Sequence, residues 1–510
     1  MQVQNIEEYL WAHFGYKNFR EGQRPIIEDV LNGNDVLGIL PTGTGKSLCY
    51  QLPALIFQGA TLVVSPLISL MSDQEKQLKA VGIKKVVAIN SFLNPQERTE
   101  VLKRLHDYKL IYLSPEMLQN QRMLQALKKL PIDLFVIDEA HCISQWGHEF
   151  RTDYLKLDQI IHELADPPVL ALSATATPEV QEDIFKQLKK PNMIKRVHSM
   201  DKINVSFAVE HMSSAEEKIE RIAEILSGRK AACMIYFSSR QWAERAASAL
   251  QQKLSQRIAF YHGGMEQTDR LLIQQQFMND QLDIVCCTSA FGMGLDKPDI
   301  RYVIHFHVPT QIESFIQEVG RAGRDGKPCA SLVLFTHRDY YLPQMLIQSE
   351  LPETNELHKI FRVLDTFRNK PLPHKEEIVQ VMELSESQWN FIKYQLEKHG
   401  CYSDGKISGS IEEWERMQTK VEQFLKERWH YKQGKLKEMI NWVHHKGCKR
   451  KKLYEPFQDH IRPPYVPCCD SCGFNIADLQ VENWEESSSV DSWQSRLRKM
   501  FQQEDHYEIF

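Results

Sequence analysis

The sequence predicts an α/β protein with two parallel-sheet lobes in tandem, followed by a mainly helical C-terminal region. Short apolar runs alternate with helical patterns from about residue 35 to residue 200, and the alternation restarts at about residue 230. Continuous apolar runs are typical of parallel strands, because helices cover both faces of their sheet. After about residue 345 the runs stop, and long charged segments with helical spacing replace them.

Length and composition agree with a multidomain globular protein. The chain has 510 residues, of which 42% are hydrophobic and 25% are charged, as in ordinary globular domains. No apolar run approaches the roughly 18 residues that a membrane-spanning helix needs, and the start lacks the pattern of a secretory signal. The net charge is −5, so any nucleic acid must bind to local basic patches. We expect a cytoplasmic protein without membrane partners.

The apolar runs give the strands of the two lobes in order. In the first lobe, residues 1–205, the expected strands are VLGIL, TLVVS, KVVAI, LIYL, LFVIDE and PVLALS. In the second lobe, residues 206–345, they are ACMIYF, RIAFYH, DIVCCT, RYVIHF and SLVLF. The segment MDKINVSFAVEHMSS, near residues 200–215, interrupts the alternation and marks the boundary.

Residues 346–410 are expected to form a small helical domain. Residues 355–370 and 376–399 have helical patterns with the breaker PLP between them, and two short extended pieces flank an Asp404-Gly405 turn. Helices followed by a hairpin are typical of a winged helix, and a plain helical connector is the alternative.

The remaining residues divide into two segments. Residues 411–475 combine a long charged helix with a cysteine cluster. Residues 476–510 are expected to form an acidic, serine-rich linker and a short amphipathic helix.

The segment LPTGTGKS, residues 40–47, has the composition and context of a phosphate-binding loop, or P-loop. Its glycines allow backbone N–H groups to surround phosphate oxygens, Lys46 would reach the β- and γ-phosphates, and Ser47 would bind Mg²⁺. Leu40 stands where the consensus has its first glycine, and a plain glycine-rich turn is the alternative. The residues expected around the phosphates are Thr42, Gly43, Thr44, Gly45, Lys46 and Ser47.

Two further segments supply charged groups for phosphate chemistry. The strand LFVI ends in Asp138 and Glu139; the first would hold Mg²⁺, and the second would orient and deprotonate the attacking water. Arg321 and Arg324 are three residues apart in QEVGRAGRDG, so both can point the same way from a helical turn. They would act on the γ-phosphate as arginine fingers, and two surface arginines are the alternative.

Together these motifs identify a resemblance to a known family. PTGTGKS, DEAH, SATAT, AFGMGLDKPD and QEVGRAGRDG follow one another as in superfamily-two helicases. The segments FGYKNFREGQ (residues 14–23) and DEAHCISQWGHEFRTDY (residues 138–154) resemble RecQ-type DNA helicases. The chain is most similar to their short RecS-like form from Gram-positive bacteria, because too few residues follow Cys472 for the winged helix that longer members place there.

The resemblance implies two RecA-like lobes and an ATP- and Mg²⁺-dependent DNA helicase that moves 3′ to 5′ in recombination and repair. It implies single-stranded and forked or tailed duplex DNA as partners, together with single-stranded-DNA-binding protein and repair proteins, at the bacterial nucleoid. An RNA helicase is one alternative, since that class shares the DEAH sequence. A DNA translocase or ATP-gated DNA-binding regulator that does not separate strands is the other.

The resemblance also assigns residues to the adenine base. Tyr16 would stack on the base, Arg20 would lie nearby, and Gln23 would hydrogen-bond its N6 and N7.

On the DNA side, the aromatic-rich loop after DEAH would contact bases and phosphates through Trp146, His148 and Arg151, and Ser65 would contact phosphate. A tryptophan packed in the core is the alternative for Trp146.

A cysteine cluster near the C-terminus predicts a zinc site. Cys448, Cys468, Cys469 and Cys472 supply four thiolates, the ligand set of tetrahedral zinc. The family carries such a module, but Cys468 and Cys469 are adjacent here, which departs from its spacing. A redox pair of Cys469 and Cys472, or buried free thiols, are the alternatives.

A basic run surrounds the first of these cysteines. Lys449, Arg450, Lys451 and Lys452 are expected to form a patch that binds DNA phosphates. A solvated helix face is the alternative reading of this run.

Overall fold

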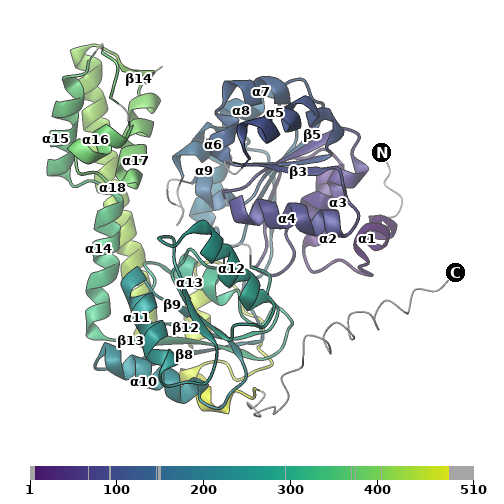
Figure 1. Ribbon diagram of the computed structural model, residues 1–510, viewed down its shortest axis with the longest axis vertical. Helices are drawn as coiled ribbons and strands as arrows, with labels where there is room; N and C mark the ends of the chain where they lie inside the picture. Colours follow the sequence, from purple (N-terminus) through teal and green to yellow (C-terminus); the bar gives the residue numbers. More distant parts are fainter. Residues whose placement is uncertain are drawn as a thin grey trace.

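The computed structural model shows two lobes, one above the other, with a helical arm along one side (Figure 1). It describes residues 6–66, 68–90, 93–144, 146, 151–292, 295–368, 370–373, 375–403 and 405–481. Among these residues, no helix is both long and apolar enough to cross a membrane.

The first lobe is a parallel sheet with helices on both faces. Its strand order is β3-β4-β2-β5-β6-β1-β7. The strands are β1 (Val36–Ile39), β2 (Ala60–Val64), β3 (Val86–Ile89), β4 (Leu110–Leu113), β5 (Ile132–Ile137), β6 (Val169–Ser173) and β7 (Ile194–Val197). The helices are α1 (Ile6–Phe14), α2 (Gln23–Leu31), α3 (Leu48–Ile56), α4 (Ile68–Ala80), α5 (Pro95–Lys103), α6 (Pro115–Leu118), α7 (Gln121–Leu127), α8 (Leu157–Glu163) and α9 (Pro178–Gln187).

The second lobe repeats this architecture. Its strands are also parallel, in the order β10-β11-β9-β12-β13-β8. They are β8 (Val205–His211), β9 (Ala232–Tyr236), β10 (Ile258–Tyr261), β11 (Ile284–Cys287), β12 (Ile300–His305) and β13 (Cys329–Phe335). The helices are α10 (Ala215–Leu226), α11 (Arg240–Gln251), α12 (Gln267–Met278) and α13 (Ile312–Val319).

The predicted fold class is confirmed, and each apolar run named in the sequence is a strand. Two edge strands, β7 and β8, were not expected. β7 has the sequence IKRV, in which Lys195 and Arg196 interrupt the apolar pattern, and its side chains are only partly buried. β8 lies inside the segment near residues 200–215 that interrupts the alternation, and it pairs with β13 along its whole length.

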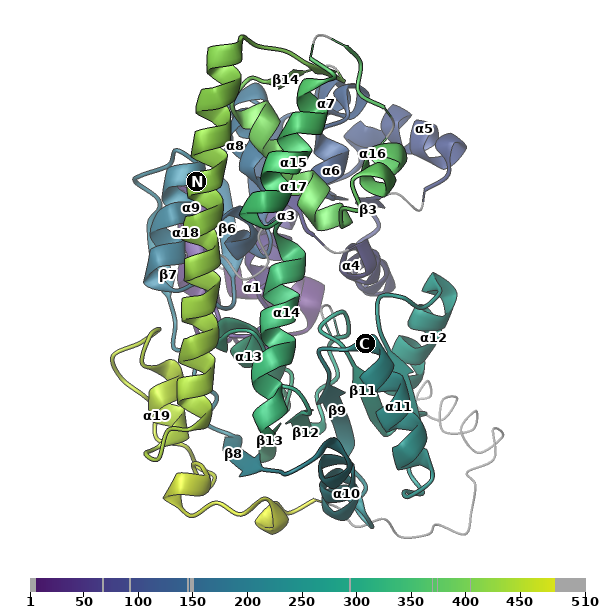
Figure 2. The same cartoon turned by 90° about the vertical axis from the view of Figure 1, so that its left-hand side faces the viewer.

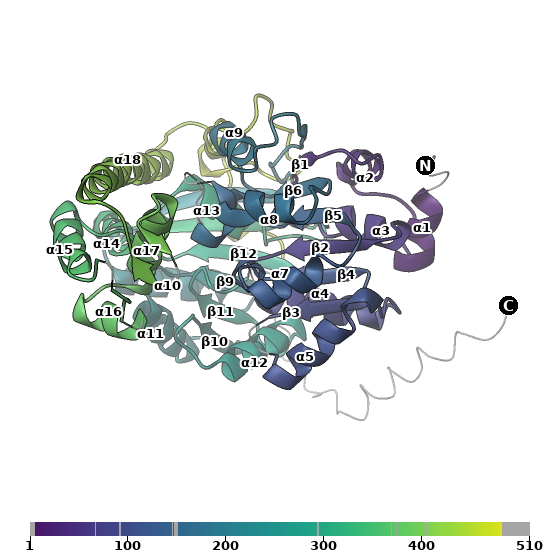
Figure 3. The same cartoon turned by 90° about the horizontal axis from the view of Figure 1, so that it is seen from above.

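The helical arm, residues 341–443, has two long helices and a small domain at its tip. α14 (Tyr341–Glu350) lies beside the lower part of α18 (Ile411–Val443), and Figure 2 shows both helices along their length. Seen from above, the arm lies on the side of the molecule opposite to α1 (Figure 3). The tip contains α15 (Thr354–Asp365), α16 (Lys375–Val381), α17 (Glu386–Lys398), β14 (Tyr402–Ser403) and β15 (Lys406–Ile407).

The tip has the element order of a winged helix. β14 and β15 form an antiparallel hairpin with Tyr402 opposite Ile407, and Asp404, expected at its turn, lies outside the described residues. The helix expected at residues 376–399 is divided into α16 and α17. The division has a local cause, because Glu383 has a φ of 51° and Ser385 begins α17 with a reciprocal capping box.

The arm contacts both lobes. At its base, Lys435 of α18 forms an ion pair of 2.8 Å with Glu313 of α13, and the ring of Trp442 packs 4.7 Å from that of Phe315. At its tip, Glu397 of α17 forms an ion pair of 2.7 Å with Lys156 of the first lobe. The tip also has its own buried core, which includes Phe361, Trp389, Ile392 and Trp414.

The chain after α18 covers the edge of the second sheet. The cysteine module, which we define as residues 448–472, begins with α19 (Lys449–Tyr454). The Phe207 N–H of β8 donates to the Cys468 carbonyl at 3.2 Å, and the Ser206 hydroxyl donates to the Pro467 carbonyl at 2.6 Å. The first of these bonds satisfies a backbone N–H that an open sheet edge would leave unpaired.

Trp442 should be a major source of stability at the junction of arm and second lobe. Its side chain is fully buried, and its indole N–H donates to the Lys449 carbonyl at 2.9 Å. Trp442→Ala should therefore lower the free energy of unfolding by about 3–5 kcal/mol, measured by urea denaturation. The matched control is Trp429→Ala in the same helix, where the side chain is 42% exposed and we expect a change within about 0.5 kcal/mol. Equal losses in the two variants would contradict this assignment.

Candidate active site

The P-loop lies where β1 ends, at the carboxyl edge of the first sheet. Gly43 and Gly45 have φ values of 83° and 75°, which side chains with a Cβ rarely adopt. The Thr44 hydroxyl donates to the Pro41 carbonyl at 2.8 Å and closes the turn. The loop then enters α3 directly after Ser47. A glycine-rich turn that runs directly into a helix N-terminus is the arrangement that anion binding requires.

Two of the residues expected at the adenine base, Arg20 and Gln23, contact the P-loop. The Gln23 amide N–H₂ donates to the carbonyls of Thr44 at 2.7 Å and Gly45 at 3.0 Å. The Arg20 guanidinium donates to the Gly43 carbonyl at 2.7 Å. Tyr16 is 55% exposed, so its ring is accessible to a ligand. Segment 14–23 therefore braces the P-loop, a role that the sequence did not indicate.

The two acids lie at the end of β5, on the same edge of the sheet. Asp138 is buried, and burial raises its pKa to about 7, with a further increase from the charge of Glu139 and an opposing effect of Lys46. A buried carboxyl group of this kind is stabilised in its charged form by a cation. Asp138 and Ser47 therefore fit a Mg²⁺ ion beside the phosphates.

A histidine and a serine support the second acid. His141 is fully buried, and its Nδ1 lies 3.0 Å from the Ser173 hydroxyl and 3.4 Å from Glu139 Oε2. Ser173 is the first residue of SATAT, so DEAH and SATAT are in direct contact. The order of these motifs is visible in the sequence, whereas the contact of His141 with Ser173 is visible only in the structure.

Arg324 of the second lobe lies against the P-loop of the first. Two glycines show how closely the lobes approach each other. A Cβ atom added at Gly43 would lie 3.0 Å from the Cγ atom of Arg324. A Cβ atom added at Gly320 would lie 1.8 Å from the Thr42 hydroxyl. The Arg324 guanidinium donates to the Leu295 carbonyl and to Asp296, both at 2.7 Å. These two hydrogen bonds hold the Arg324 side chain at the lobe boundary.

Arg321 lies deeper in the second lobe. Its side chain is buried and donates to the Gly292 carbonyl, while its Nε has no hydrogen-bond partner among the described residues. The structure therefore separates the two arginines, and Arg324 is the one beside the P-loop.

A pocket of about 200 Å³ opens between the lobes at this point. It is lined by residues from the P-loop, segment 14–23, the connector between the lobes, the arginine segment and the cysteine module: Glu21, Pro41, Thr42, Gly43, Thr44, His198, Ser199, Asp201, Lys202, Ile203, Asn204, Gly323, Arg324, Gly326 and Arg462. Lys202 donates to the Gly320 carbonyl at 3.0 Å, and burial lowers its pKa to about 8. Sequence reasoning missed Lys202 and Arg462, since neither stands in a recognisable motif.

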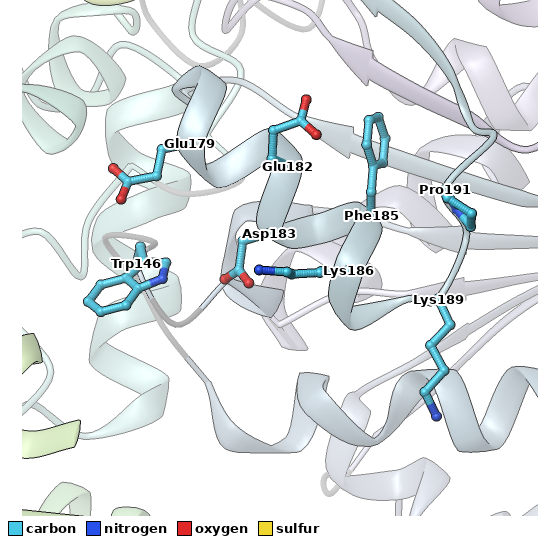
Figure 4. A pocket seen from close by; sticks show the side chains of 8 residues that line it. All are labelled: Trp146, Glu179, Glu182, Asp183, Phe185, Lys186, Lys189 and Pro191. Carbon is cyan, nitrogen blue, oxygen red and sulfur yellow. The ribbon is translucent and has the colours of Figure 1, made fainter. Parts of the chain in front are cut away.

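Trp146 lies between the first lobe and the arm. Its ring is 5.1 Å from that of Tyr431 in α18, and it borders a pocket of about 650 Å³ along α9. Figure 4 shows Trp146 facing the acidic side chains of Glu179 and Asp183 across this pocket. Lys186 and Lys189 also line this pocket, so Trp146 is a partly buried contact residue beside a surface of mixed charge.

The other residues expected to bind DNA have different environments. Ser65 is buried, with 2% exposure, so it is not accessible to DNA in this structure. Arg151 donates to the Pro66 carbonyl at 3.2 Å and holds the segment that follows β2. His148 lies outside the described residues.

The four cysteines come together, as the sequence predicts. Their sulfur atoms all lie within 4.8 Å of one another, and Cys448 Sγ is 3.6 Å from Cys468 Sγ. Zn–S bonds of about 2.3 Å in a tetrahedron place sulfur atoms about 3.8 Å apart. The backbone N–H of Lys449 donates to Cys469 Sγ at 3.3 Å, and a hydrogen bond from Cys468 lowers the pKa of Cys469 to about 5. The cluster, including the adjacent pair, thus fits zinc.

The prediction of a four-residue basic patch is wrong for its first two members. Lys449 is buried and donates to the Val443 carbonyl at 2.6 Å, at the end of α18. Arg450 is also buried, lies over the ring of Phe207, and donates to the Lys202 carbonyl at 2.7 Å. The first turn of α19 faces the second lobe, so the charged groups of Lys449 and Arg450 form contacts inside the protein. Lys451 and Lys452 are exposed.

Comparison with known proteins agrees with these motifs. Residues 20–184 match the family model of the DEAD/DEAH box helicases, and residues 217–326 match that of the helicase conserved C-terminal domain. A probable ATP-dependent DNA helicase RecS from Bacillus subtilis is 42% identical over 97% of this chain and 98% of its own length. An ATP-dependent DNA helicase RecQ from Haemophilus influenzae is 41% identical over 69% of this chain, which spans 57% of that relative.

Solved structures show the same fold at lower identity. The helicase MrfA bound to DNA has a TM-score of 0.57 with 21% identity, covering 67% of this chain and 52% of its own. The DEAD-box helicase Mss116 bound to single-stranded RNA has a TM-score of 0.55 with 18% identity, covering 85% of this chain and 90% of its own. The resemblance drawn from the sequence motifs is confirmed, and the chain belongs to the family of RecS- and RecQ-type ATP-dependent DNA helicases.

Proposed function

We propose that the chain hydrolyses ATP between its two lobes, moves 3′ to 5′ along single-stranded DNA and separates duplexes in recombination and repair. This proposal rests on two contacts across the lobe boundary. Gly43 of the P-loop lies against Arg324, and Thr42 lies against Gly320. One nucleotide site completed by two lobes links their separation to the state of the nucleotide. If each lobe holds the strand, every cycle of closing and opening moves the protein along it.

Each group of the site has a separate task in hydrolysis. Lys46 and the P-loop N–H groups bind the phosphates, and Asp138 and Ser47 hold Mg²⁺, which neutralises developing charge on the phosphate oxygens. Glu139 orients the attacking water and accepts its proton, and His141 lies beside its carboxylate. Arg324, and Arg321 behind it, supply positive charge from the second lobe.

The relatives support the choice of DNA and the setting. Proteins named DNA helicases are similar over most of this chain, so we propose single-stranded and forked or tailed duplex DNA as substrates and a bacterial cytoplasmic, nucleoid-associated location. Single-stranded-DNA-binding protein and repair proteins are the proposed partners. For contact with DNA, we retain Trp146 as a candidate for stacking on bases, and Arg151, Lys451 and Lys452 as candidates for phosphates.

A strand-displacement assay tests this proposal directly. Duplexes with a 3′ tail, a 5′ tail, blunt ends or a 3′ RNA tail should be offered at equal concentration with Mg²⁺ and ATP. The 3′ DNA-tailed duplex should be unwound at least about tenfold faster than the other three, because the motor loads on a single DNA strand and tracks in one direction. Faster unwinding of the 5′-tailed duplex would overturn the polarity, and faster unwinding of the RNA-tailed duplex would overturn the substrate. ATP hydrolysis without unwinding of any duplex would indicate a translocase.

We also propose that the cysteine module binds one zinc ion per chain. Structural zinc contributes about 10–16 kcal/mol of apparent binding energy at neutral pH, so Cys469→Ser should lose the metal and lower the thermal unfolding temperature. Metal analysis of the purified protein measures the first effect and calorimetry the second. Cys401→Ser is the control, because Cys401 lies in the tip of the arm and its removal should leave the zinc content at one. Well-folded parent protein without zinc would refute the site.

A further inference from the structure

The connector between the two lobes is held by the cysteine module along its length. This connector, residues 198–204, joins the end of β7 to the start of β8. The Met200 N–H donates to the Gln458 side chain (2.8 Å), and the carbonyls of Lys202 and Ile203 accept from Arg450 (2.7 Å) and from the Tyr465 N–H (3.2 Å). At the start of β8, the Ser206 hydroxyl and the Phe207 N–H donate to the carbonyls of Pro467 (2.6 Å) and Cys468 (3.2 Å). A connector fixed at successive residues moves together with the module that holds it.

Arg462 is the residue of the module that is most firmly attached to this connector. Its backbone N–H donates to Asp201 Oδ2 at 2.8 Å, its Nε donates to Asp201 Oδ1 at 3.1 Å, and its Nη2 donates to the Asp201 carbonyl. The Asp201 side chain is fully buried. The guanidinium is therefore held in one orientation before it meets any group of the first lobe.

The remaining nitrogen of Arg462 reaches the first lobe. Its Nη1 lies 3.1 Å from Glu21 Oε2, and Glu21 stands between Arg20 and Gln23, the two residues that donate to P-loop carbonyls. Arg462 also lines the pocket that contains Thr42 and Arg324. One side chain thus connects the segment that braces the P-loop with the connector.

The same connector also reaches the arginine segment of the second lobe. Lys202, next to Asp201, donates to the carbonyls of Gly320 and Ala322, which flank Arg321. The connector therefore contacts the second-lobe side of the nucleotide site through Lys202, and the first-lobe side through Arg462.

We propose that Arg462 is a positioning residue for ATP binding, which latches segment 14–23 of the first lobe to the connector through Glu21. This inference rests on the proposed ATP site. The latch favours the closed arrangement of the lobes, in which Arg324 lies at the P-loop. Loss of the latch lowers the fraction of molecules that are ready to bind ATP, and so weakens apparent affinity without changing the chemistry in the closed state.

The expected effect is moderate, because Glu21 is exposed and exposed ion pairs are weak. The orientation of Arg462 is fixed in advance by Asp201, which reduces the ordering cost of the pair. We therefore expect the KM for ATP to rise about two- to fivefold, and kcat to stay near the parent value, when either partner is removed.

The experiment measures ATP hydrolysis against ATP concentration with saturating single-stranded DNA for Glu21→Gln, Arg462→Ala and the double variant. Each single variant should raise KM, and the double variant should raise it no further, since both changes remove the same pair. The increase should shrink at high salt. Glu100→Gln, an exposed carboxylate on α5, is the matched control and should keep the parent KM.

Several results would overturn the latch. The first is an unchanged KM for ATP in Glu21→Gln. The second is a KM in the double variant that equals the product of the two single-variant increases. The third is a decrease in kcat as large as the increase in KM. If Arg462→Ala alone is impaired and also loses zinc, Arg462 serves the fold of the module. Lys46→Ala separates the two proposals: full activity in that variant overturns the ATP site itself, whereas an inactive Lys46→Ala with normal latch variants overturns the latch alone.

Discussion

The contact between the P-loop and the arginine segment, across the boundary of the two lobes, is the interaction on which the rest of the structure depends. Gly43 of the loop leaves space that Arg324 occupies, and Gly320 leaves space for Thr42. A side chain at Gly320 would collide with Thr42 across the boundary, and one at Gly43 would crowd Arg324. The nucleotide site is complete only when both lobes are in this arrangement, which is why hydrolysis can be coupled to movement.

The C-terminal third of the chain maintains this arrangement from outside. The cysteine module holds the connector, and the arm rests on the second lobe at Glu313 and on the first lobe at Lys156. The ion pair at the tip is partly exposed, so it can break and re-form as the lobes move. The base is built around buried Trp442, and it should move as one body with the second lobe.

Local patterns predicted the motor well, because a parallel sheet places the ends of its strands at one edge. The P-loop and Asp138 could be assigned to one site for that reason. Contacts between distant segments could not be predicted: Glu21 and Arg462 are 441 residues apart. The sequence predicts that Lys449 to Lys452 form one exposed patch, but the first two are buried. A run of charged residues does not reveal which face of α19 packs against the protein.

The central claim is that the second lobe completes the nucleotide site through Arg324. Single-turnover hydrolysis of bound ATP tests it most directly, with Arg324→Ala compared with Arg338→Ala, an exposed arginine of the same lobe. An arginine finger is typically worth about 10³–10⁵ in rate, so Arg324→Ala should bind ATP in the presence of Mg²⁺ yet hydrolyse it at least about a thousandfold more slowly than the parent. Arg338→Ala should match the parent. Hydrolysis at the parent rate in Arg324→Ala would contradict the account.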